Sequence, residues 1–229
     1  MVSYNDITKL TFFYENKLHN KIIEYVISLC GSNNILDILH FIKQERFVEE
    51  TSSIKINYDN KEVVIFKENF LTDLPTKKFE SYTLDNFEYV IGYPDILEYT
   101  CSPMHCIKKI IHCGDEHVFN STKDYSVIPV TMYSELKPII NNYVEELKKV
   151  YVYSVGKIKS RFFLNIDLII NIIYLAFVTS YKHLVQEQLF LMKEFNFTYE
   201  TFSRLTPHEI NHYVKTGVKL INERNNSET

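Results

Sequence analysis

The sequence feature that most constrains the fold is one long apolar stretch, from Phe162 to Met192. Between Leu168 and Val178 every residue except Asn171 is apolar, which is typical of a helix that other elements surround on most sides. After Thr179 polar residues recur along one side. We therefore predict one long helix, deeply buried in its first half and amphipathic in its second half, around which the rest of the chain packs.

A transmembrane helix is the alternative for this stretch, because Phe162 to Val178 has about the minimum length that a bilayer requires. Asp167 counts against it, since an aspartate within the bilayer costs about 2.5 to 3.5 kcal/mol. Asn165 and Asn171 add to that cost. We predict a buried helix with Asn165 or Asp167 as its N-cap and no membrane span. A membrane-associated factor stays open as an alternative.

The composition is that of a globular protein. Of the 229 residues 45% are hydrophobic and 24% are charged, which argues against disorder. The 25 basic and 29 acidic residues are mixed along the chain, so no positive field attracts a polyanion. Residues 1–17 lack a charged leader followed by an apolar run, and the four cysteines have no disulfide-framework spacing. We therefore expect a reducing cytoplasm and no nucleic-acid partner.

Two amphipathic helices are expected near the N-terminus. The first covers residues 16–29 and ends at Cys30 and Gly31. The second begins with Ser32 or Asn33 as its N-cap. The two helices are expected to form an antiparallel pair. The apolar residues of the second helix share one face: Ile35, Leu36, Leu39 and Ile42.

A small antiparallel sheet is expected next. Residues 54–58 and 63–66 have extended apolar patterns on either side of Asp59-Asn60, which is typical of a β-hairpin. Residues 87–91 indicate a third strand. Residues 71–83 are polar and contain proline, so a connector with little regular structure is expected there. Three strands of this size need a helical layer on one face.

The remaining chain indicates helices. A helix is expected at residues 103–113, with Ser102 as its N-cap and Pro103 at the first helical position. Another is expected at residues 131–150, where Pro138 should kink it or restart it behind a new N-cap at Ser134. The apolar stripe of that helix is Leu136, Ile140, Tyr143 and Leu147.

Two shorter helices close the chain. Thr198 is expected to cap a helix that extends through Leu205. Thr206 and Glu209 form a capping box that opens a last helix to about Asn222. Residues 225–229 are expected to be a frayed tail.

Together these elements predict a mostly helical α+β fold. A small antiparallel sheet (residues 54–100) packs with an N-terminal helical pair (residues 1–53). A C-terminal helical bundle (residues 101–229) surrounds the long buried helix. The alternative is that all three regions form one compact unit.

The densest group of potential metal ligands lies between residues 101 and 117. Cysteine and histidine are the usual zinc ligands. The short spacing leaves no room for two zinc knuckles to fold back on each other, so we expect no metal, while a small zinc protein or zinc enzyme stays open as an alternative. The six candidate ligands are Cys101, His105, Cys106, His112, Cys113 and His117.

Enzymatic function is not expected. No acyl-transfer motif surrounds any of these cysteines, and no oxyanion hole is indicated nearby. The five glycines of the chain do not have the spacing of a phosphate-binding loop. We therefore predict no catalytic residue and no cofactor.

Aromatic residues gather toward the C-terminus, where they either fill the core or form a partner interface, because aromatic side chains are enriched in both. The sequence leaves the two interpretations open. The candidate interface residues are Tyr181, Phe190, Phe195, Phe197, Tyr199 and Phe202.

Three segments, in this order, resemble the baseplate hub assembly proteins of T-even-type contractile-tailed phages. They are the strand Tyr89–Pro94, the helix expected at Cys106–Ile110, and the ending Phe195–Tyr199 with Thr206–Ile210. The resemblance covers residues 54–222. The segment before residue 54 does not align with that family, and residues 101–117 are richer in cysteine and histidine than its pattern.

The resemblance implies a non-enzymatic role in building the central hub of the phage baseplate, as a hub component or as an assembly factor. The implied partners are other hub or tail proteins. The implied location is the host cytoplasm during assembly, or the tail baseplate of the virion. The oligomeric state is not implied.

Overall fold

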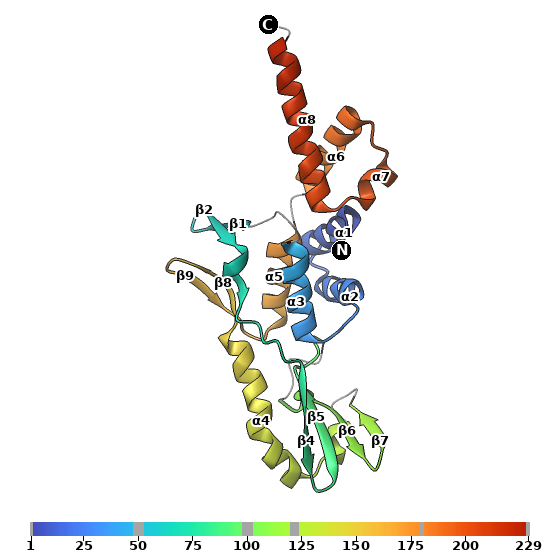
Figure 1. Cartoon of the computed structure of the whole chain (residues 1–229), viewed down its shortest axis with the longest axis vertical. Coiled ribbons are helices and arrows are strands. Elements are labelled where there is room, and N and C mark those ends of the chain that lie inside the picture. The colour runs from blue at the N-terminus through green and yellow to red at the C-terminus, as the bar shows by residue number, and fades with distance from the viewer. Residues whose placement is uncertain (1, 48–52, 98–102, 120–123, 179–180, 228–229) are drawn as a thin grey trace.

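The computed structural model describes residues 2–47, 53–97, 103–119, 124–178 and 181–227. It has the mostly helical α+β fold that the sequence predicts, in an elongated molecule (Figure 1). The helices are α1 (Tyr4–Glu15), α2 (His19–Cys30), α3 (Ile35–Arg46), α4 (Val130–Lys149), α5 (Ile166–Phe177), α6 (Tyr181–Phe195), α7 (Tyr199–Arg204) and α8 (Pro207–Ser227).

The strands of the described residues form three separate antiparallel sheets. One is the ribbon β1-β2, the second has the order β3-β8-β9, and the third has the order β4-β5-β6-β7. The strands are β1 (Ser53–Tyr58), β2 (Lys61–Phe66), β3 (Phe70–Thr72), β4 (Phe79–Leu84), β5 (Phe87–Gly92), β6 (Ile107–His112), β7 (Asp115–Val118), β8 (Tyr151–Val155) and β9 (Ile158–Arg161).

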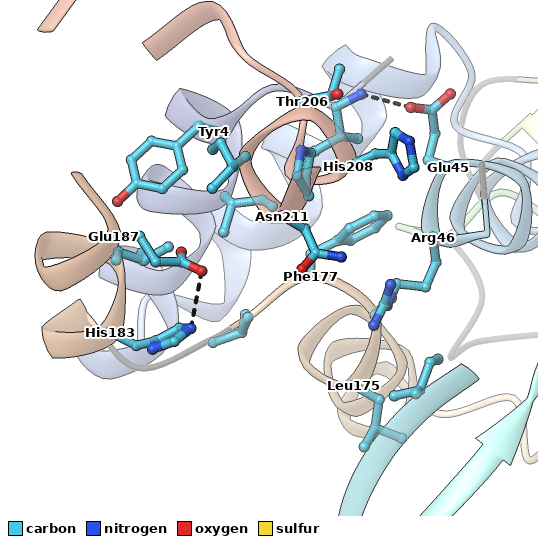
Figure 2. Close-up of a pocket in the computed structure, with 18 of the residues that line it drawn as sticks. Tyr4, Glu45, Arg46, Leu175, Phe177, His183, Glu187, Thr206, His208 and Asn211 are labelled. Carbon is cyan, nitrogen blue, oxygen red and sulfur yellow. Dashed lines mark hydrogen bonds and ion pairs between the residues drawn. The ribbon is translucent and has the colours of Figure 1, made fainter. Parts of the chain in front are cut away.

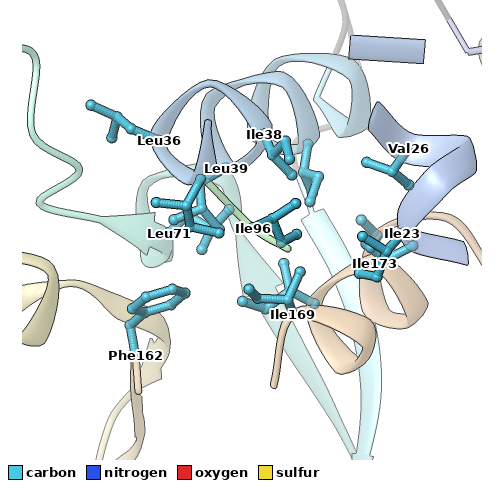
Figure 3. Close-up of a cluster of buried hydrophobic side chains, with 14 of the residues drawn as sticks. Ile23, Val26, Leu36, Ile38, Leu39, Leu71, Ile96, Phe162, Ile169 and Ile173 are labelled. Atoms are coloured by element: carbon cyan, nitrogen blue, oxygen red, sulfur yellow. The ribbon is translucent and has the colours of Figure 1, made fainter. Parts of the chain in front are cut away.

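Helix α5 lies at the centre of the molecule, in contact with α1, α2 and α3 (Figure 1). The side chain of Asn165 caps it by accepting a hydrogen bond from the Asp167 amide at 2.7 Å, as predicted. Figure 3 shows Ile169 and Ile173 of α5 in one cluster with apolar residues of α2 and α3. Each buried aliphatic side chain of this kind contributes about 1.5 to 3 kcal/mol. The buried residues of α5 are Ile169, Ile170, Ile172, Ile173, Ala176 and Phe177.

The prediction of one continuous helix, capped by Asn165 or Asp167 and extending to about Met192, was wrong. Helix α5 ends at Phe177, because Val178 has an extended backbone with φ −81° and ψ 134°. The second half of the stretch forms the separate helix α6, of which only Leu184 and Leu191 are buried. The two helices thus divide where the apolar pattern narrows from most of the helix surface to a single stripe.

Among the described residues, one helical stretch is long and apolar enough to cross a membrane by length and composition alone, residues 166–195. A buried core helix passes the same test. Helix α5 alone rises only about 18 Å, against a hydrocarbon core of about 30 Å. Its buried face is occupied by α1, α2 and α3, so its apolar composition is explained by the protein core.

The N-terminal region contains three helices where the sequence predicted a pair. Helix α1, which was not predicted, begins with a capping box of Ser3 and Asp6. Asp6 also joins α1 to α2, since its Oδ1 accepts a hydrogen bond from the Tyr25 hydroxyl at 2.6 Å. The predicted end of α2 is confirmed, with Gly31 in the left-handed conformation. The N-cap of α3 is Asn34, which is neither of the two predicted residues, Ser32 and Asn33.

The predicted hairpin is confirmed as β1-β2, with Asp59 and Asn60 at its turn, both at positive φ. The predicted three-stranded sheet was wrong, because β5 does not pair with this hairpin. It lies between β4 and β6 in the four-stranded sheet. The expected connector, residues 71–83, contains the end of β3 and most of β4.

The helix predicted at residues 103–113 was also wrong, and a β-bulge explains why. Residues 103–106 form one 3₁₀ turn, and the next residues form β6. The pairing shifts register between Val90 and Ile91, so that Lys109 faces Val90 while Ile107 faces Ile91. The extra residue Lys108 brings Ile107 and Ile110 to the buried face three positions apart, which is also the spacing of a helix.

Helix α4 confirms the predicted buried stripe and corrects the prediction around Pro138. The helix continues through Pro138 without a restart. Ser134 is not an N-cap, since its Oγ donates to the Val130 carbonyl within the helix at 2.9 Å. Helix α4 packs on β5 and on the 3₁₀ turn at residues 103–106.

The two C-terminal caps are confirmed. Thr198 Oγ1 accepts a hydrogen bond from the Thr201 amide at 3.2 Å, and Thr206 forms the capping box with Glu209. Helix α8 continues to Ser227, beyond its predicted end and into the predicted tail. Strands β6 to β9 show that residues 101–229 are not a purely helical bundle.

One hydrophobic cluster contains buried residues from all three predicted regions. It connects the helices around α5 with the sheet that α4 covers. The boundaries at residues 53 and 100 stay a prediction.

Candidate functional site

The predicted zinc ligands occupy different environments. His105 and Cys106 are buried at the start of β6, and burial raises the pKa of the Cys106 thiol to about 12. His112 and Cys113 are exposed at the far end of that strand. A strand rises about 3.3 Å per residue, so about 20 Å separates Cys106 from His112. His117 follows on β7, and Cys101 lies outside the described residues.

Three of these histidines pack their rings against aromatic side chains. The ring of His105 stacks on Tyr125 at 5.5 Å, and that of His112 stacks on Phe87 at 4.2 Å. His117 meets Phe119 edge to face at 4.9 Å. Within the ranges that the structure describes, no group of three or more His, Cys, Asp or Glu side chains is arranged to hold a metal ion.

The predicted aromatic interface divides into a buried part and an exposed part. Phe202 is fully buried, with its ring centroid 4.0 Å from that of Tyr4, so it joins α7 to α1 and is not a surface residue. Phe195 and Phe197 pack around Tyr213 of α8. Tyr181 and Tyr199 are exposed. The six residues therefore do not form one surface.

Helices α6, α7 and α8 together make an extension that we call the C-terminal arm. Figure 1 shows α8 reaching beyond α6 toward the C-terminus. The two helices approach closely at Gly217, where a Cβ atom would lie only 2.8 Å from Cζ of Phe190. A glycine at this position thus permits the aromatic packing between them.

Large apolar side chains remain exposed on both long helices of the arm. Leu189 on α6 is 61% exposed and Val218 on α8 is 47% exposed. Met192 and Leu220 are also exposed. Contiguous exposed apolar side chains are characteristic of protein-interaction surfaces, and these four residues are the candidates for such a surface on the arm.

One cavity bordered by described residues lies where the arm joins the central helices. It has a volume of about 620 Å³. Its walls come from the start of α1, the end of α3, strand β1, the end of α5, and the first turns of α6 and α8 (Figure 2). The end of α5 and the start of α6, which the sequence predicted to be one helix, both border this cavity.

Polar side chains line parts of the cavity wall. His183 Nε2 and Glu187 Oε1 of α6 are 3.1 Å apart. Burial raises the pKa of Glu187, while the nearby His183 acts in the opposite direction. Glu45 accepts a hydrogen bond from the Val2 amide at 2.6 Å. Thr206, His208 and Asn211 contribute from the start of α8 (Figure 2).

Arg46, the last residue of α3, is a cation of the cavity wall, as is Lys55 of β1. The Nε of Arg46 is buried and has no hydrogen-bond partner among the described residues. Burial lowers its pKa, with no charged neighbour acting against that effect. The sequence did not single out Arg46, because the residues around it come from five distant segments.

Comparison with known proteins gives no relatives for this chain. No protein-family model matches it, and neither a curated protein nor a solved structure matches it.

Proposed function

We propose that this chain is a non-enzymatic phage protein that acts in assembly of the central hub of the tail baseplate, through contacts with other hub or tail proteins. The observation that carries the proposal is the C-terminal arm with its exposed apolar side chains. A protein that works by presenting surface needs such residues and needs no reactive group. The proposed location is the host cytoplasm during assembly.

The resemblance to the baseplate hub assembly proteins supports the phage part of the proposal. Two of its three segments have the expected secondary structure: Tyr89–Pro94 contains the end of β5, and Thr206–Ile210 opens α8. The middle segment, Cys106–Ile110, is a strand where a helix was expected. The proposal therefore rests on the ends of the resemblance and on the arm.

The partners can be identified by affinity purification from infected cells. A tagged copy of the chain is expressed in the host during infection with the phage that encodes it, and co-purified proteins are identified by mass spectrometry. We expect baseplate hub or tail proteins to be enriched. Enrichment of none of them contradicts the proposal.

A pair of matched double variants assigns the contact to the arm. Leu189→Glu with Val218→Glu places two charges on α6 and α8, and should reduce recovery of the partner at least about tenfold, because desolvating a charge at an apolar contact costs several kcal/mol. Val127→Glu with Val130→Glu places two charges on exposed positions near the start of α4, where Val130 is 80% exposed. That control should leave recovery unchanged. An equal loss of partner recovery in both double variants would show that the contact does not depend specifically on the arm.

A further inference from the structure

The Arg46 side chain is half-buried, its Nε is buried without a hydrogen-bond partner, and it forms no ion pair with a carboxylate within the described part of the chain. Its guanidinium carbon lies 5.8 Å from the centroid of the Phe47 ring, a cation–π contact. A buried charge without an opposite charge is costly. An external anion can supply the missing charge, because an arginine forms strong and often bidentate hydrogen bonds with a carboxylate or a phosphate.

We propose that the cavity at the junction of α3, α5, α6 and α8 binds a carboxylate that carries an apolar group, with Arg46 holding the carboxylate. The planar guanidinium offers paired N–H donors with the spacing of carboxylate oxygens. The proposal goes beyond the assembly function and does not depend on it, since it concerns the cavity and not the exposed face of the arm.

The cavity wall suits both parts of such a ligand. Leu175 and Phe177 of α5 line the cavity on the side of Arg46 (Figure 2), and Ile210 of α8 is a further apolar lining residue. These side chains accommodate the apolar group. The first turn of α8 also borders the cavity, and the positive end of a helix dipole favours an anion. The volume of about 620 Å³ lies in the usual range of small-ligand sites.

The other charged groups of the wall have local partners. Glu45 accepts the hydrogen bond from the Val2 amide, and Glu187 pairs with His183. Lys55 pairs with Glu62 of β2 at 2.8 Å. Arg46 therefore differs from these groups in having its charge available to a ligand.

Isothermal titration calorimetry on the full chain at constant ionic strength tests this proposal. The probes are hexanoate, the neutral analogue hexanol, acetate and inorganic phosphate. We expect saturable one-to-one binding of hexanoate, and at least about tenfold weaker binding of the other three, because each lacks either the carboxylate or the apolar group. Absence of hexanoate binding, or equal binding of hexanol, overturns the proposal.

Three variants locate the binding. Arg46→Gln should weaken hexanoate binding about 10- to 100-fold, the loss expected for hydrogen bonds to a charged group. Arg204→Gln, at an exposed arginine of α7, should leave it unchanged. Asn211→Phe narrows the cavity from an exposed position of α8 and should also weaken binding, without touching Arg46. Unchanged affinity in both Arg46→Gln and Asn211→Phe contradicts the assignment, and circular dichroism verifies that each variant is folded.

Two peptide probes then distinguish a small metabolite from a partner chain as the source of the carboxylate. A short peptide that ends in leucine is titrated with a free and with an amidated C-terminus. Tighter binding of the free peptide than of hexanoate assigns the site to a chain terminus. Tighter binding of hexanoate assigns it to a small carboxylate.

Discussion

Helices α5 and α6 come from one apolar stretch of the sequence but have opposite relations to the molecule. Helix α5 is surrounded by α1, α2 and α3 and buries half of its residues, six of 12. Helix α6 has two buried residues among 15 and shares the arm with α8. The difference teaches that apolar composition alone does not separate a core helix from a helix that offers apolar surface. The width of the apolar face distinguishes these two kinds of helix.

The largest expected difference between the two helices is in the free energy of unfolding. Ile173→Ala removes a fully buried side chain of α5, which should cost about 2 to 5 kcal/mol through lost burial and the cavity that it leaves. Leu189→Ala on α6 removes a mostly exposed side chain and should change stability by less than about 0.5 kcal/mol. Chemical denaturation measures both. Equal costs would remove the distinction between core and arm.

The next largest effect on stability is expected for a substitution that disturbs the packing between α6 and α8. Gly217→Val places branched carbons against Phe190 and should cost about 1 to 3 kcal/mol through overpacking. We expect faster amide exchange in α6 and α8 with unchanged exchange in α5, measured by hydrogen–deuterium exchange. Lys219→Val, at an exposed position of the same helix, controls for the lower helix propensity of valine. Faster exchange in α5 would show that arm and core unfold together.

The helix caps should give smaller and more local effects. Asn165→Ala and Thr206→Ala each remove the side-chain oxygen that caps a helix, at a cost of about 1 kcal/mol. Because α5 belongs to the core, Asn165→Ala should lower global stability in chemical denaturation. Thr206→Ala should instead accelerate amide exchange in the first turns of α8 alone. A global loss from Thr206→Ala would contradict the local role of that cap.

The smallest expected effect is a pH dependence at the start of α1. Burial acts to raise the pKa of Asp6, but hydrogen bonds from Tyr25 and Ser3 outweigh it, so that the pKa lies below its ordinary value of 3.8. Asp6 therefore binds a proton more readily in the unfolded chain than in the folded one. Its stabilising contribution is complete above pH 3.8 and is lost as the pH falls through the lower folded-state pKa.

Thermal melting as a function of pH measures this contribution. We expect the difference in stability between the original chain and Asp6→Asn to shrink as the pH falls below 3.8. The matched change Asp115→Asn, at an exposed position of β7, serves as the control. A difference that stays constant down to strongly acidic pH would exclude a lowered pKa at Asp6.

Local patterns predicted those parts of the fold that local chemistry determines. The turn at Asp59 and Asn60, the end of α2 at Gly31, and the capping boxes and N-caps depend on a few neighbouring residues. The buried stripe of α4 follows from a long regular period. These features could be predicted because no distant segment has to be known.

The wrong predictions depend on contacts between distant segments. The bulge at Lys108 arises from pairing with β5 and imitates helical spacing. Helix α5 ends at Phe177, where the deeply buried part of the stretch ends. The continuous apolar run in the sequence does not reveal this end. The cavity with Arg46 requires the ends of helices that lie far apart in the sequence. None of these contacts has a local signature. Gly114 was interpreted as the end of a helix, whereas Cys113 and Gly114, both at positive φ, form the turn between β6 and β7.

The most direct test of the account compares hydrogen–deuterium exchange of the free chain with that of the chain purified together with its partner. The account predicts that amides of α5 exchange slowly in both states and that amides of α6 and α8 become protected only with the partner. Protection that appears solely around α4 and its sheet, with the arm unchanged, would contradict it.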